Sequence, residues 1–139
     1  QLVKEKIPTI VNAFSDSKQG VTNIDKITVV ITEQNKPNFC FSTSNDYDDI
    51  FHIKLGESLC KEDPNLVYSG LFDEGEKIRI IVYCGEKISK IKKAGDIVKD
   101  VSEILGGAGG GGPNFAQGGG KDKSKKDEAV NSVKSMILN

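Results

Sequence analysis

The glycine-rich segment 106–121, which reads GGAGGGGPNFAQGGGK, holds the residues best suited to bind a ligand. Because glycine has no Cβ, another backbone approaches such a segment closely, and successive N–H groups turn toward one anion. The N-terminus of a following helix would add further donors for a phosphate or a ribose. The spacing therefore predicts a backbone cradle for such a group. Four lysines lie at the same end of the segment: Lys121, Lys123, Lys125 and Lys126.

A flexible linker is the alternative interpretation of so many glycines. Against it, the pentad Pro113–Gln117 is rigid and partly apolar, and Phe115 is expected to insert into the core. The segment is also longer than most helix–helix connections in a compact domain. We therefore predict a structured loop between two helices. It is neither a phosphate-binding P-loop nor a dinucleotide-binding loop, because a helix and not a strand precedes the glycines.

The cysteines and the single histidine offer little catalytic or metal chemistry. Cys40, Cys60 and Cys84 are too widely spaced for a zinc knuckle, and His52 supplies only one further ligand. Cys40 and Cys84 lie in apolar alternations and are predicted to be small buried hydrophobes. His52 is predicted to be partly exposed at a strand-to-helix boundary. We expect neither a catalytic group nor a metal site.

Length and charge limit the class of protein further. The chain has 139 residues, enough for one domain, and 19 Lys+Arg against 20 Asp+Glu exclude a simple polybasic module. Residues 85–139 nevertheless carry a net +3 and residues 1–84 a net −4, which places the positive field around the glycines. No apolar run approaches the ~18–20 residues of a membrane span, and there is no secretory signal. We expect a soluble cytoplasmic domain.

Hydrophobic periodicity places helices and strands around the glycine segment. Helices are predicted over 3–14, 50–61 and 94–105, and a last helix begins at a capping box formed by Ser124 and Asp127. Residues 15–23 are predicted to be a loop. Strands are predicted over 24–32, 38–42, 66–72 and 77–84. The order predicts an α/β fold in which helices pack on a mixed β-sheet of about four to five strands.

The motifs from residue 94 onward resemble a known family. Ala94-Gly95, Leu105-Gly106-Gly107 and the following GGGGPNFAQGGGK are similar to the C-terminal domain of alanyl-tRNA synthetases, part of the wider DHHA1 group. The resemblance is specific over residues 94–121, is supported by element order over 66–138, and rests on element order alone upstream of residue 60. It implies one DHHA1-like domain over 1–139, excised from a longer chain of archaeal type. Residues 1–14 would be the end of a preceding linker helix or the first domain helix.

The resemblance implies a non-catalytic domain that binds the outer corner of tRNA(Ala) and mediates homodimer formation. The ATP, magnesium and zinc chemistry of the parent enzyme would lie in other domains, with no cofactor here, and neither DNA nor a membrane is expected as a partner. Valine at Gly110 or Gly119 is expected to weaken RNA binding without unfolding the domain. The implied RNA-binding residues are Gly107, Gly109, Gly110, Gly111, Gly112, Pro113, Gln117, Gly118, Gly119, Gly120, Lys121, Lys92 and Lys93.

Two positions depart from the family pattern. Ala108 and Gly112 stand where family members often carry a basic residue, so Lys121 or Lys92-Lys93 would have to substitute. Two other functions remain open: the accessory domain of a DHH-type phosphoesterase, or a pure oligomerisation module. The phosphoesterase branch places a His after the glycines, where this chain has Pro113-Asn114.

Overall fold

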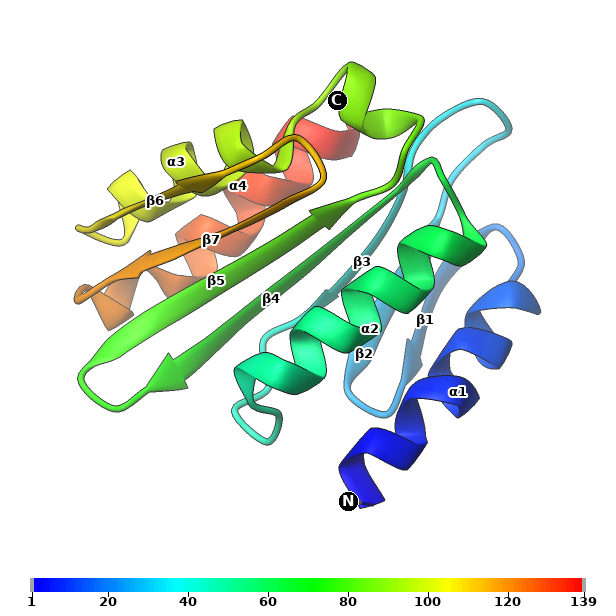
Figure 1. Ribbon diagram of the computed structural model, residues 1–139, viewed down its shortest axis with the longest axis horizontal. Helices are drawn as coiled ribbons and strands as arrows, with labels where there is room; N and C mark the ends of the chain where they lie inside the picture. The colour runs from blue at the N-terminus through cyan, green and yellow to red at the C-terminus, as the bar shows by residue number, and fades with distance from the viewer. Residues whose placement is uncertain (1, 139) are drawn as a thin grey trace.

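A single seven-stranded sheet organises the domain (Figure 1). The computed structural model describes residues 2–138, with side chains from Glu5 onward. The α/β class is confirmed, with more strands than predicted. The strands, in the order β1-β2-β3-β4-β5-β7-β6 across the sheet, are β1 (Gly20–Ile24), β2 (Ile27–Ile31), β3 (Asn38–Ser42), β4 (Leu66–Glu74), β5 (Lys77–Cys84), β6 (Ala108–Gly111) and β7 (Phe115–Gly120).

The helices cover the two faces of the sheet in pairs. Helices α1 (Leu2–Ser15) and α2 (Asp49–Glu62) pack on one face, and α3 (Ala94–Ile104) and α4 (Lys126–Leu138) pack on the other. Short 3₁₀ turns, η1 (Ile88–Lys90) and η2 (Lys123–Lys125), precede α3 and α4. Only β3 and β4 are parallel, and α2 is the crossover helix that joins them.

Two hydrophobic cores follow from side-chain alternation along the central strands. Ile78, Ile80 and Val82 of β5 pack beneath α3 and α4, whereas Tyr83 packs on the α2 side. In α1, Ile7, Ile10 and Phe14 form an apolar stripe that is buried in the core; the side chain of Val3 lies outside the described residues. The burial of Cys40 and Cys84 is likewise confirmed.

The predicted loop 15–23 and the start of the predicted strand 24–32 are wrong, because this region is a β-hairpin whose second strand, β2, lies within 24–32. Strand β1 begins at Gly20, and a two-residue turn separates it from β2. Asp25 and Lys26 form that turn in the left-handed region, with φ of 50° and 69°. Such turns usually carry Asn-Gly or Asp-Gly, so a β-branched run interrupted by Asp-Lys gives no turn signal.

Two further local predictions are wrong. His52 lies within α2 and is fully buried, not partly exposed at its boundary. The reason is Gly70 on the neighbouring strand, which leaves the space that the imidazole fills. Ser124 lies in η2 and donates to Asp122, so it forms no capping box, and α4 begins two residues later at Lys126.

Candidate nucleic-acid interface

The glycine segment is a β-hairpin at the edge of the sheet. Residues 106–121 are structured, as predicted, but they extend the sheet and do not form a loop cradle. Strand β7 pairs antiparallel with β5 from Ile78↔Gly120 to Tyr83↔Phe115, and β6 forms the edge beyond it. Glycine has low β-propensity, which conceals these strands in the sequence. These strands need glycine because α3 lies directly against the hairpin and leaves little space for side chains.

Most of the glycines are required for close packing. A Cβ on Gly109 would lie 2.8 Å from Val98 Cγ1, and a Cβ on Gly118 would lie 2.5 Å from Ser102 Oγ, both on α3. The same construction at Gly107, Gly111, Gly119 and Gly120 meets backbone atoms at 2.0–2.6 Å. The expectation that valine at Gly119 leaves the fold intact is therefore wrong, because its Cβ would lie 2.1 Å from Ile78 O.

Gly110 and Gly112 are different, because an added Cβ would have no close neighbour at either position. A Cβ on Gly110 would meet nothing within 4 Å, and one on Gly112 would meet only Phe115 O at 4.0 Å. Gly110 pairs with Gln117 across the hairpin, on the face turned away from α3. This part of the hairpin therefore presents backbone that a ligand can reach.

The tip of the hairpin occupies the N-terminus of α3. The Ala94 N–H donates to Pro113 O and the Gly95 N–H donates to Gly112 O, both at 2.9 Å. Because these donors are taken by the hairpin itself, the first turn of α3 is not an open anion site. The contacts fix the glycine strands in place.

The face turned away from α3 forms a shallow cavity of about 350 Å³. We define this open face by the side chains that β5 and the hairpin present there, namely Lys77, Arg79, Ala108, Gln117 and Lys121, with the backbone of the intervening glycines. Lys77 and Lys121 form no ion pair among the side chains from Glu5 to Leu138. The open face thus combines bare backbone with two uncompensated cations.

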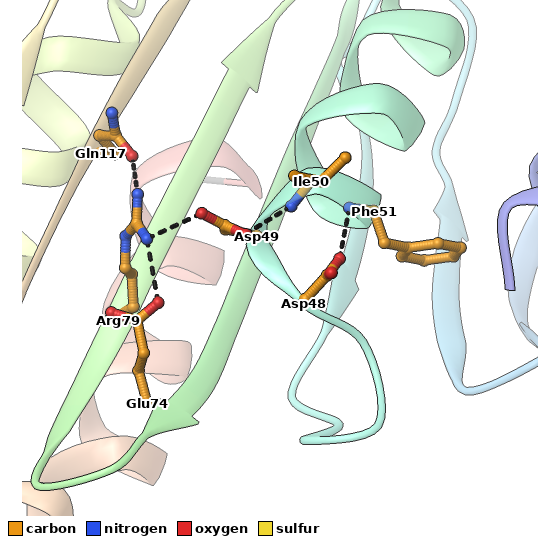
Figure 2. A network of polar contacts seen from close by, with 7 residues as sticks. All are labelled: Asp48, Asp49, Ile50, Phe51, Glu74, Arg79 and Gln117. Carbon is orange, nitrogen blue, oxygen red and sulfur yellow. Dashed lines mark hydrogen bonds and ion pairs between the residues drawn. The ribbon is translucent and has the colours of Figure 1, made fainter. Parts of the chain in front are cut away.

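Arg79 lies at the centre of the polar contacts on this face (Figure 2). Its Nη1 donates to Asp49 Oδ2 at 3.2 Å and to Glu74 Oε2 at 3.0 Å, and its Nη2 donates to Gln117 Oε1. Asp49 belongs to the first turn of α2, whose N-cap Asp48 accepts from the Phe51 N–H at 2.9 Å. The network therefore ties the start of α2 to the glycine hairpin.

An aromatic pair borders the hairpin near its tip, where β7 begins at Phe115. The rings of Tyr83 and Phe115 lie 4.8 Å apart between centroids, and Gly56 of α2 lets the Tyr83 ring approach. Partial burial raises the pKa of the Tyr83 hydroxyl, and the Glu57 carboxylate adds to the rise. Phe115 is half-buried on Tyr83 at the surface, so the expected insertion into the core is wrong. Asn114 extends this end by donating to Cys84 O at 3.0 Å.

The predicted lysines are divided between the two ends of the hairpin. Lys121 joins Lys77 and Arg79, whereas Lys93 lies at the tip with Lys99, beside Gly112; Lys92 is half-buried before α3. Lys77, Arg79 and Tyr83 were not among the residues predicted from the sequence. One signal could have found them, since the alternation in KIRIIVYC places all three on the face opposite Ile78, Ile80 and Val82.

Among the described residues, no group of three His, Cys, Asp or Glu side chains could hold a metal ion. No helix within residues 2–138 is both long and apolar enough to cross a membrane.

Comparison with known families and relatives gives consistent matches. The DHHA1 domain family matches residues 54–139. The chain is 50% identical over 103 residues to an alanine–tRNA ligase of Nitrosopumilus maritimus, covering 74% of this chain and 11% of that protein. Against an alanine–tRNA ligase of Methanospirillum hungatei it is 33% identical over 143 residues, covering 96% and 15%. The chain thus spans roughly a tenth of the length of the curated relatives it matches.

Solved structures agree with this comparison. The C-Ala domain of Aquifex aeolicus alanyl-tRNA synthetase superposes with a TM-score of 0.66 at 26% identity, covering 78% of this chain and all of that one. A DHH domain described as a member of the s1p family of ribosomal proteins has a TM-score of 0.59 at 16% identity, covering 98% and 31%. The second likeness is one of fold alone.

Proposed function

The chain belongs to the DHHA1 domain family, and on that basis we propose that it forms the C-terminal domain of an alanyl-tRNA synthetase, binds the outer corner of tRNA(Ala) and joins two copies of the enzyme. The observation that carries the RNA-binding half is the open face, where backbone free of side chains lies beside Lys77 and Lys121. Catalysis, with its ATP, magnesium and zinc, belongs to other domains of a cytoplasmic enzyme.

The surroundings of the two departures from the family pattern support this proposal. Ala108 lines the same cavity as Lys77 and Lys121, and Gly112 lines a cavity at the tip with Lys93 and Lys99. Each missing basic residue therefore has two lysines as neighbours. These lysines would supply the positive charge that the family pattern places on the hairpin itself.

A surface of this kind recognises RNA by shape with few phosphate contacts. The outer corner of a tRNA is a compact fold of two loops, which offers backbone oxygens and exposed base faces. The hairpin backbone approaches such a surface closely, and the half-buried Tyr83–Phe115 pair offers an apolar border for it. Binding then depends less on salt than it does for a polybasic protein.

Titration with tRNA(Ala) across a salt series tests the proposal. We expect a slope of log K against log[salt] of about −1 to −3, because each neutralised phosphate contributes roughly −0.7 to −0.9. Lys77→Gln and Lys121→Gln should each reduce the slope by about one such contribution. The control is Lys18→Gln, in the exposed loop before β1 at the opposite edge of the sheet. Absence of binding by the unaltered domain at low salt would contradict the RNA-binding half.

Sedimentation of the isolated domain tests the dimer half. We expect a dimer at micromolar concentration, because the domain is proposed to join two synthetase chains. A monomer across that range would remove this half of the proposal. A dimer that does not bind tRNA would instead favour the oligomerisation module, in which the glycines serve only close packing.

A further inference from the structure

The orientation of the Gln117 side-chain amide is fixed by its neighbour. The Arg79 guanidinium carries five N–H donors and no acceptor. Gln117 therefore meets Arg79 through its oxygen, and its two N–H donors on Nε2 point away (Figure 2). Gln117 is exposed and lines the open face opposite Gly110, which has no side chain to cover it.

Arg79 is itself held in place and electrically compensated. Asp49 and Glu74 both lie within 3.2 Å of Nη1, and only 21% of the Arg79 side chain is exposed. Two carboxylates offset its single positive charge. A guanidinium with both Nη groups engaged in this way is a poor phosphate ligand, although it is a rigid support for a neighbouring amide.

We propose that Arg79 is a positioning residue, which fixes Gln117 so that its Nε2 donates to a backbone oxygen of the bound RNA. This inference rests on the function proposed above. It specifies a backbone oxygen because Nε2 is a donor only, and phosphate and sugar oxygens are the acceptors that proteins contact most often on a nucleic acid. The bidentate contact by which glutamine reads adenine would require the oxygen, which already accepts from Arg79, to face the same base as the nitrogen.

A double-mutant cycle at residues 79 and 117 tests the inference. Gln117→Ala should weaken tRNA binding about tenfold, the scale of one hydrogen bond to a charged group. Arg79→Lys keeps the charge but loses the planar fork, and should weaken binding about fivefold through disorder of the amide. The double variant should bind about as weakly as Gln117→Ala alone, because the two residues act through one contact.

Two readouts separate positioning from a general loss of stability or charge. The salt slope should stay unchanged in all three variants, whereas Lys121→Gln should lower it. Gln117→Glu keeps an oxygen for Arg79 but removes both donors, so it should bind at least as weakly as Gln117→Ala. Each variant is first shown to be folded by its thermal unfolding curve, and binding is measured well below the midpoint.

The inference is overturned if the Arg79→Lys and Gln117→Ala losses add fully, if Arg79→Lys binds normally, or if it changes the salt slope. It is also overturned if the Gln117→Ala loss disappears when base pairs of the tRNA corner are exchanged, since a backbone contact does not depend on base identity. Failure of the parent proposal looks different, because the unaltered domain would then not bind tRNA at all.

Discussion

Gly120→Ala is expected to lower the free energy of unfolding by about 3 kcal/mol, the scale of severe overpacking in a core. Gly120 is buried where β7 passes the end of α3, and an added Cβ would lie 2.0 Å from Leu105 O and 2.8 Å from Gly107 N. Neither backbone atom is free to move. Leu105 O accepts from the Asp122 N–H at 2.9 Å, and the Gly107 N–H donates to Ser102 O at 2.8 Å. Urea unfolding followed by circular dichroism measures the loss.

Gly110→Ala is the matched control on the same hairpin. Its Cβ would have no neighbour within 4 Å, so its stability should lie within about 0.5 kcal/mol of the unaltered domain. Both substitutions add one methyl group to a glycine strand, and they differ in what that group meets. Equal losses in the two variants would show that the hairpin needs glycine for a reason other than its distance from α3.

The second large effect is a loss of stability in acid, caused by His52. Burial lowers the pKa of its imidazole to about 4, although the carboxylates of Asp48 and Asp49 oppose the shift. The ring lies 2.6 Å from the Tyr68 hydroxyl through Nδ1 and stacks on Phe72 at 4.8 Å. Nε2 has no hydrogen-bond partner among the described residues, so a proton there would be buried without an acceptor.

The direction of the pH dependence follows from the two pKa values. An unfolded histidine titrates near 6.5, so between pH 6.5 and 4 the unfolded chain gains a proton that the folded domain refuses. Stability contributed by neutral His52 is complete above pH 6.5 and is lost as the pH falls toward 4, by about 3 kcal/mol in total.

The contribution of His52 can be isolated by urea unfolding at several pH values between 7 and 4. The free energy of unfolding is measured for the unaltered domain and for His52→Gln. Glutamine removes the titrating group, so the variant is less stable at pH 7 but loses less on acidification. The difference between the two proteins should shrink by roughly the amount that His52 contributes. Parallel pH profiles would show that His52 takes up its proton in the folded state at an ordinary pH.

The spacing of apolar residues along the sequence predicted those helices and strands that such local spacing defines. Strand β3 was placed at its observed bounds, and α3 was placed within one residue, because apolar spacing and Gly106 mark the ends of that helix. Strands β6 and β7 were missed, because glycine carries no side chain from which to read an alternation. Whether a glycine-rich segment pairs as a strand depends on its partner. Here the partner is β5, which lies about 40 residues earlier in the sequence and offers an unpaired edge.

The candidate site was predictable in part for the same reason. Gln117 and Lys121 could be proposed from their place in the motif, whereas Arg79 becomes part of the site only through the pairing of β5 with β7. Which glycines face α3 and which face outward also depends on that register. Gly110 therefore could not be distinguished from Gly119 by sequence alone.

The exposed backbone of the hairpin has a practical consequence for mapping the surface. Alanine scanning removes atoms, and at Gly110 and Gly112 there are no side-chain atoms to remove. A scan would find Gln117 and the two lysines and pass over the strands that carry them. Bulk has to be added at such positions, or the amide proton replaced by an ester linkage, before the main chain's own share in recognition becomes measurable.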